Sequence, residues 1–146
     1  MTPEIYFWTI HNNKEKCQRV CELVYRAFSR SQRVLILTPN GAASEFVSQL
    51  LWHMPPDQYI PHTIVTKAIA HPIGYVPAAI VITTRAINFN RAHHLIQLCP
   101  EVPKNHDEFA CIHELDDRSD PEKERATLRK KEVYKNRENF TSFALV

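Results

Sequence analysis

A continuous apolar run early in the chain limits the folds that the chain can adopt. The stretch R-V-L-I-L-T, residues 33–38, carries four consecutive aliphatic side chains between Arg33 and Thr38. A strand that is apolar at every position is buried on both faces, which is typical of a parallel sheet covered by helices on each side. The run therefore predicts a buried strand of an α/β protein.

Strand and helix patterns alternate around this run. Residues 5–10, I-Y-F-W-T-I, predict a buried first strand that ends at the turn-prone segment 11–13. Apolar residues then recur at three- and four-residue spacing over 14–28, which predicts an amphipathic helix. A second helix is expected after the turn at 39–41. The core faces of these two helices carry Cys17, Val20, Cys21, Val24 and Phe28, and Phe46, Val47, Leu50 and Leu51.

The second half of the chain predicts three further strands and a charged helix. The strands are P-A-A-I-V-I-T-T (77–84), H-H-L-I-Q-L-C (93–99) and F-A-C-I-H-E-L (109–115), with a brief helix within 102–109. Asp120 followed by Pro121 is a helix-start signature, and we expect that helix to run to about Asn139. The alternation predicts a doubly wound, largely parallel α/β sheet with helices on both faces.

Length and composition exclude several classes of protein. A chain of 146 residues suits a single domain spanning 1–146, and we expect residues from about 140 to 146 to form a flexible tail. A net charge of +2 is too small for a protein that coats nucleic acid. Neither a signal segment nor an apolar run of the ~20 residues needed to span a bilayer is present. We therefore expect a cytoplasmic protein with no membrane contact.

Glycine is too rare for a nucleotide-binding loop. The chain has two glycines, and Gly41, in T-P-N-G-A-A, fits neither G-x-G-x-x-G nor G-x-x-x-x-G-K-[ST]. We expect no nucleotide and no other cofactor.

The histidines and cysteines form no recognisable metal motif. The chain has eight His and four Cys, with no H-E-x-x-H and no C-x-x-C. His93 and His94 are adjacent, so a strand would point them to opposite faces. We therefore expect no metal site. A small enzyme in which Cys99 or Cys111 acts as nucleophile with His94 or His113 is an open alternative, although a buried thiol is normally inert.

The segment 118–137 carries eight basic residues against four acidic ones. Such a helix is commonly a solvated face held by weak charge pairs. It is also a candidate cationic site for a phosphate backbone or an acidic peptide. Direct binding of single-stranded nucleic acid through this helix is a further alternative.

Four motifs together resemble one family in order and spacing. They are R-V-L-I-L-T, L-L-W-H-M-P-P-D-Q-Y-I-P-H (50–62), H-L-I-Q-L-C-P-E-V-P (94–103) and Y-K-N-R (134–137). They resemble the chi subunit of the bacterial DNA polymerase III holoenzyme over roughly residues 5–140. The most specific part is L-W-x-x-x-P-x-x-[FY]-[IV]-P-H, residues 51–62.

The resemblance implies a replisome adaptor that is not an enzyme. It implies a Rossmann-like α/β fold without a nucleotide-binding loop. In that family one face binds the psi subunit, which links chi to the clamp loader. A separate pocket binds the acidic, Phe-terminated tail of the single-stranded DNA-binding protein. Such a tail needs Lys or Arg beside an apolar slot. Direct DNA binding is then not expected.

The tail-binding residues carry over unevenly. The family helix carries R-x-R-Y-[KR], where this chain has Leu128, Arg129, Lys130, Lys131 and Glu132, so only Lys130 matches a basic position. Neighbouring cations are candidates to replace the lost charge. The resemblance implies a tail site at Lys123, Arg129, Lys130, Lys131, Tyr134 and Lys135.

The resemblance implies a psi-facing surface at Trp52, Pro55, Tyr59 and Pro61. Prolines that hold two large aromatic side chains make a preorganised docking surface, for psi or another clamp-loader component, with His53 and His62 as polar accessories. The alternative is that Trp52 and Tyr59 simply cover the edge of the sheet.

Overall fold

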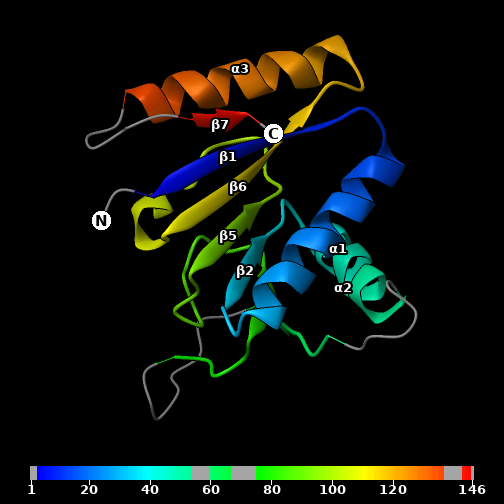
Figure 1. The fold of residues 1–146 in the computed structure, drawn as a ribbon, viewed down its shortest axis with the longest axis vertical. Helices are drawn as coiled ribbons and strands as arrows, with labels where there is room; N and C mark the ends of the chain where they lie inside the picture. The colour runs from blue at the N-terminus through cyan, green and yellow to red at the C-terminus, as the bar shows by residue number, and fades with distance from the viewer. Residues whose placement is uncertain (1–2, 54–59, 67–74, 137–142, 146) are drawn as a thin grey trace.

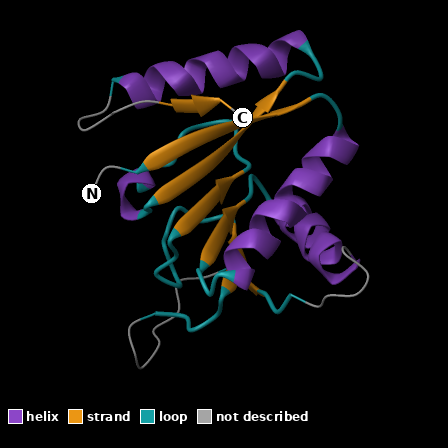
Figure 2. Cartoon of the chain, in the orientation of Figure 1, coloured by secondary structure: helices purple, strands orange, loops and turns teal. Residues whose placement is uncertain are grey.

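The computed structural model describes residues 3–53, 60–66, 75–136 and 143–145. Within them, strands and helices alternate along much of the chain (Figures 1 and 2). The elements are β1 (Glu4–Ile10), α1 (Asn13–Ser29), β2 (Val34–Leu37), α2 (Gly41–His53), β3 (Thr63–Val65), β4 (Ile80–Thr83), β5 (His94–Gln97), the 3-10 helix η1 (His106–Glu108), β6 (Cys111–Asp117), α3 (Pro121–Lys135) and β7 (Phe143–Leu145).

The strands form one sheet in the order β3-β4-β2-β5-β6-β1-β7, and each neighbouring pair is parallel. Helices α1 and α2 pack on one face, whereas α3 lies across the other (Figure 1). The predicted fold class, a Rossmann-like parallel sheet with helices on both faces, is confirmed.

The apolar run that predicted this fold is buried on both faces as β2. Val34 and Ile36 pack against α1 and α2, whereas Leu35 and Leu37 pack in the core on the α3 face. All four side chains are 0–4% exposed. Burying an aliphatic side chain of this size contributes roughly 1.5–3 kcal/mol, so this strand anchors both cores.

The helix boundaries follow the capping signals. Asn12 Oδ1 accepts a hydrogen bond from the Glu15 backbone N–H at 2.9 Å, which starts α1. Asp120 Oδ1 accepts from Lys123 N–H at 2.9 Å and starts α3 at Pro121, as predicted. Helix α3 ends at Lys135 with its C-cap at Asn136, earlier than the expected end near Asn139.

The second helix differs from its predicted core face. Val47 and Leu51 are buried, but Phe46 is 53% exposed. Ser44 and Ser48 take buried positions instead. Ser44 Oγ lies 2.6 Å from Thr38 Oγ1, and this hydrogen bond satisfies two buried hydroxyl groups.

Two short strands were not predicted. Strand β3 pairs with β4, and β7 pairs in parallel with β1, within the stretch expected to be a flexible tail. Three-residue strands are too short for a periodic pattern and are formed by pairing at a sheet edge. None of the helices in the described part of the chain is long and apolar enough to cross a membrane.

Candidate functional site

Helix α3 is anchored to the sheet by a buried polar network. Glu114, in β6, is fully buried. Its Oε1 accepts a hydrogen bond from Lys130 Nζ at 2.8 Å, and its Oε2 accepts one from Tyr134 Oη at 2.6 Å and one from Gln97 Nε2 at 3.4 Å. Desolvation raises the pKa of Glu114, and the charge of Lys130 together with the hydrogen bonds from Lys130, Tyr134 and Gln97 opposes that shift.

This network uses two of the residues that the resemblance placed at the tail site. Lys130 is 8% exposed and Tyr134 is 1% exposed. The ammonium group of Lys130 is already paired with a carboxylate, so Lys130 presents less net charge to a ligand than a surface lysine would. Sequence reasoning missed Glu114 because it lies in a strand, 16 residues before its lysine partner.

A cavity of about 190 Å³ opens beside this network, at the carboxyl ends of β5 and β6. Ligands of open parallel sheets commonly bind at this end of the strands. The apolar lining comes from Leu98, Cys99, Pro100, Leu115 and Ala126, and the polar lining from Lys16, Gln97, Asp117, Lys123, Thr127 and Lys130.

A second cavity of about 350 Å³ shares Pro100 and Lys130 with the first and adds Glu101, Val102, Arg129 and Val133. We call the two cavities together the α3 groove. The groove runs between α3 and the segment 97–102 that follows and includes the end of β5. Thus Lys123, Arg129 and Lys130 meet in one groove, and Lys16 of α1 joins them.

The other two cations of the predicted set lie elsewhere on α3. Lys131 Nζ lies 5.2 Å from the centre of the Phe7 ring, in a cation–π contact with β1. Lys135 is exposed, with Nζ 4.0 Å from Glu132 Oε1. Neither lines either cavity of the groove.

Acidic groups partly neutralise the groove. Lys123 Nζ lies 3.7 Å from Asp117 Oδ2. Desolvation raises the pKa of Asp117, but hydrogen bonds from Ser119 and the charges of Lys123 and Lys16 outweigh it and hold that pKa below its usual value. Because Lys16 and Lys123 share the single carboxylate of Asp117, this end of the groove keeps a positive excess.

The Trp52 surface lies at the end of α2. Trp52 is 52% exposed, and its ring packs edge-on against His62 with the centroids 5.6 Å apart. His62 Nδ1 donates to the Ile60 carbonyl at 2.9 Å, so its Nε2 accepts from Ser48 Oγ at 2.8 Å. His62 therefore braces Trp52 rather than serving as a polar accessory. Pro61 is exposed, whereas Pro55 and Tyr59 lie outside the described residues.

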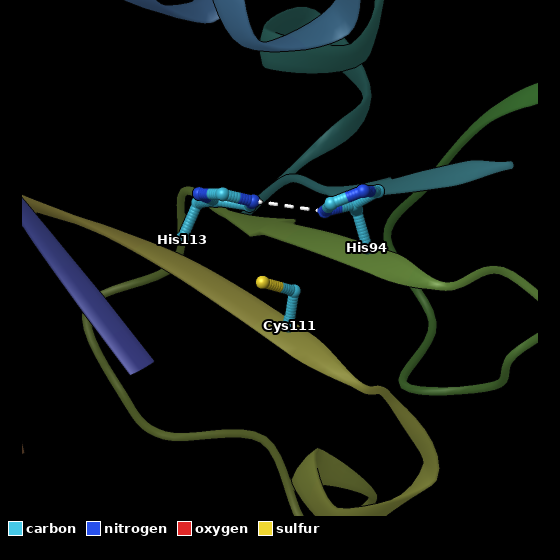
Figure 3. Close-up of side chains that lie close together, drawn as sticks. All are labelled: His94, Cys111 and His113. Atoms are coloured by element: carbon cyan, nitrogen blue, oxygen red, sulfur yellow. Dashed lines mark hydrogen bonds between the residues drawn. The ribbon is translucent and has the colours of Figure 1, made fainter. Parts of the chain in front are cut away.

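A third cluster lies under α1, on the opposite face of the sheet from α3. His94 of β5 and Cys111 and His113 of β6 bring their ligand atoms within 4.8 Å of one another (Figure 3). Burial lowers the pKa of His94 to about 4 and that of His113 to about 3, so both imidazoles are neutral at pH 7.

The neutral rings form a directed chain of hydrogen bonds. The Trp8 indole N–H donates to His113 Nδ1 at 3.0 Å, because an indole nitrogen is only a donor. The proton of neutral His113 is then on Nε2, which lies 3.1 Å from His94 Nδ1. The proton of His94 is in turn on Nε2, 2.8 Å from Gln32 Oε1.

The cluster does not support the cysteine-nucleophile alternative. Burial raises the pKa of Cys111 to about 11, whereas an activated thiol has a lowered pKa. Cys99 packs against the core on the α3 face, and burial raises its pKa too.

The expectation that His93 and His94 point to opposite faces is wrong. Their rings contact each other with centroids 4.7 Å apart, and both line one cavity. Strand β5 begins at His94, so His93 lies before the strand. The alternation of side chains between the two faces of a strand therefore does not apply to His93.

Comparison with known proteins gives one family. The family model described as DNA polymerase III chi subunit, HolC, matches residues 1–139. A search of curated proteins found no match. The matched range includes β1 to β6 and α3, and with them the whole α3 groove. The chain therefore belongs to the DNA polymerase III chi subunit family and is a subunit of the replicative polymerase assembly.

Proposed function

We propose that this chain is a non-catalytic replisome adaptor. Its α3 groove binds the acidic, Phe-terminated tail of the single-stranded DNA-binding protein, and its Trp52 surface joins the clamp loader through psi or an equivalent subunit. Family membership supports the replisome role. The observation that carries the tail-binding proposal is the meeting of an apolar slot with Lys16 and Lys123 at the carboxyl ends of β5 and β6.

The slot suits one aromatic side chain. Its volume is about 190 Å³, and an apolar cavity of about 150 Å³ holds benzene. Leu98, Pro100 and Leu115 line it with apolar atoms. A terminal phenyl ring would leave water there, and its burial would supply the hydrophobic part of the affinity.

The cations suit the acidic part of the tail. Lys16 and Lys123 line the slot, where the α-carboxylate of a terminal Phe would lie. Arg129 lines the adjoining cavity. There it would meet the Asp side chains that precede the terminal Phe of the tail. Charge-assisted hydrogen bonds of this kind are stronger than neutral ones and add specificity for an acidic peptide. Lys130 and Tyr134 serve by fixing α3 against Glu114.

The Trp52 surface suits a protein partner. Trp52 is half exposed, yet its ring packs against the hydrogen-bonded His62 ring. Binding of a partner therefore costs little side-chain conformational entropy at Trp52. Exposed aromatic side chains of this kind are common hot spots of protein interfaces.

Peptide binding to the full chain tests the proposal. A fluorescent acidic peptide ending in Phe should bind saturably and more weakly as salt rises. Two control peptides separate the contributions, one lacking the terminal Phe and one of the same composition with Phe moved inside. Both should bind at least about tenfold more weakly, the cost of about 1.4 kcal/mol. Equal binding of all three peptides, or no saturable binding at ~50 mM salt, would refute tail binding.

A further inference from the structure

Two neighbouring strands place three metal-ligating side chains on one face of the sheet. In the β5–β6 pairing, His94 is opposite Cys111, and Ile96 is opposite His113. Cys111 and His113 are two residues apart on β6, so they share the face that α1 covers. Figure 3 shows the imidazoles of His94 and His113 end to end, with the Cys111 thiol on the same side of the sheet.

We propose that His94 Nδ1, His113 Nε2 and Cys111 Sγ form a zinc-binding site. Two imidazoles and one thiolate suit Zn²⁺, and they disfavour Mg²⁺ and Ca²⁺, which prefer oxygen ligands. Three protein ligands leave one position for water or a further ligand. The site lies on the face opposite the α3 groove, so it stands independently of tail binding.

The spacing of the two nitrogens already approaches that of a zinc site. His94 Nδ1 and His113 Nε2 are 3.1 Å apart. Two nitrogens bound at about 2.0–2.1 Å to a tetrahedral zinc are about 3.4 Å apart. The three ligand atoms, with Cys111 Sγ included, lie within 4.8 Å of one another, so binding needs rotation of both imidazoles and of the Cys111 side chain toward a common ion.

An open cavity gives access to the cluster. All three ligands line a cavity of about 300 Å³, together with Glu4 and Tyr6 of β1. The exposed Glu4 carboxylate, which accepts a hydrogen bond from Tyr6 Oη at 2.8 Å, is at hand as a fourth ligand or as a partner for a bound water.

The cavity also contains positive charge that opposes a cation. Arg26 and Arg30 line it, but Arg26 Nη2 is paired with Glu22 Oε1 at 3.0 Å. Ionised Cys111 and Glu4 supply two negative charges against them, which leaves the site able to hold a divalent ion.

The hydrogen bond of His94 Nε2 is of the kind that metal-bound histidines make. His94 Nε2 donates to Gln32 Oε1 at 2.8 Å, so Nδ1 carries the lone pair. Histidines bound to metals usually donate their second ring N–H to such an acceptor, which fixes the tautomer and the ring orientation. Gln32 is therefore a positioning residue for this site.

Zinc and the Trp8 hydrogen bond exclude each other. When His113 Nε2 binds zinc, its proton moves to Nδ1, and the Cys111 thiol proton goes to solvent. Nδ1–H then faces the Trp8 indole N–H, which loses its acceptor. Metal binding must displace the Trp8 ring, and removal of the indole N–H must favour metal binding.

Metal titration of the untagged full chain tests the site. Zn²⁺, followed by calorimetry, should bind at one ion per chain, and Co²⁺ should give the absorption band of a thiolate bound to cobalt. Zn²⁺ should also change the Trp8 fluorescence, compared in a Trp52→Phe background. Cys111→Ser should remove the cobalt–thiolate band and lower the zinc affinity at least about tenfold. The matched variant Cys99→Ser, which changes a thiol on the opposite face of the sheet, should leave both unchanged.

Two further variants test the site without removing a metal ligand, in case Cys111→Ser or a histidine variant folds poorly. Trp8→Phe should bind zinc more tightly than the wild type, and Gln32→Ala about ten- to a hundredfold more weakly. The site is refuted if one-to-one binding is absent at micromolar Zn²⁺, or if the cobalt–thiolate band survives Cys111→Ser. Weaker binding by Trp8→Phe would refute the exchange between metal and indole.

Discussion

Lys130 and Glu114 form a buried ion pair between α3 and β6, with Lys130 Nζ 2.8 Å from Glu114 Oε1. Tyr134 Oη donates to the second carboxylate oxygen at 2.6 Å. One carboxylate therefore holds two turns of the helix that forms one wall of the α3 groove. The helix docks through this polar stripe, while Leu128 on the same helix is 61% exposed.

Loss of the Glu114 charge is expected to destabilise the fold. Glu114→Gln leaves the Lys130 ammonium buried without its counter-charge, and breaking a buried pair costs about 3–5 kcal/mol. Urea unfolding measures the change in the free energy of unfolding. The exposed control Glu132→Gln should change it by less than about 0.5 kcal/mol.

The same pair offers an internal check. Adding Lys130→Met to Glu114→Gln removes the unpaired charge, so the double variant should regain part of the lost stability. If Glu114→Gln unfolds within about 1 kcal/mol of the wild type, α3 is not held by this carboxylate.

Charge reversal at Lys123 is expected to weaken tail binding without unfolding the protein. Lys123→Glu places a carboxylate beside Asp117 in the groove, so the acidic peptide should bind at least about tenfold more weakly. Lys135→Glu makes the same change of charge on α3 outside the groove and serves as the control. Fluorescence anisotropy at matched salt measures both, and an equal loss for the two variants would mean that only the net charge of α3 matters.

Removal of the Trp52 ring is expected to abolish clamp-loader association. Trp52→Ala should keep the circular dichroism spectrum of the wild type, because half of the side chain is exposed. It should no longer retain psi, or the equivalent clamp-loader subunit, in co-purification. Leu128→Ala truncates another exposed apolar side chain and should retain the partner. A folded Trp52→Ala protein that binds as the wild type does would exclude this surface.

The stability of the metal-free protein is expected to fall on acidification. Burial holds the pKa of His94 at about 4 and that of His113 at about 3, whereas the usual value is 6.5. Below about pH 6.5 these two histidines are protonated in the unfolded chain but stay neutral in the folded chain. The free energy of unfolding therefore falls as the pH is lowered from about 6.5 to about 3. The charged and titratable groups that face the pair are Glu4, Tyr6, Arg26, Arg30, His93 and Cys111.

Urea unfolding from pH 7 to pH 4, in the presence of EDTA, measures this slope. The variant His94→Gln/His113→Gln lacks the two groups, so its unfolding free energy should depend less on pH than that of the wild type. Parallel pH profiles for the two proteins would show that these histidines are not held neutral in the folded state.

The sequence predicted the main elements of the fold because their signals are local. The aliphatic run of β2, the three- and four-residue spacing of α1 and the Asp120-Pro121 start of α3 each lie within a few residues. Strands β3 and β7 carry no such signal, since three residues cannot show a period and their pairing partners are distant in sequence.

The site was less predictable because its contacts depend on register between distant segments. The sequence predicted a strand at F-A-C-I-H-E-L, which carries Cys111, His113 and Glu114. The sequence did not show that His94 lies opposite Cys111 in the β5–β6 pairing, or that Lys130 forms an ion pair with Glu114. Lys16 was missed because the start of α1 meets the groove only in the folded chain.

Mapping of the acidic peptide onto the full chain by amide chemical shifts is the sharpest test of tail binding, because it reports the partner and its site together. Tail binding in the α3 groove predicts saturable shifts at Lys16, Leu98, Lys123 and Thr127 that a Phe-terminated acidic peptide produces and that the peptide lacking Phe does not. Shifts confined to the end of α2 or to the His94 cluster, or no saturable shifts at low salt, would contradict it.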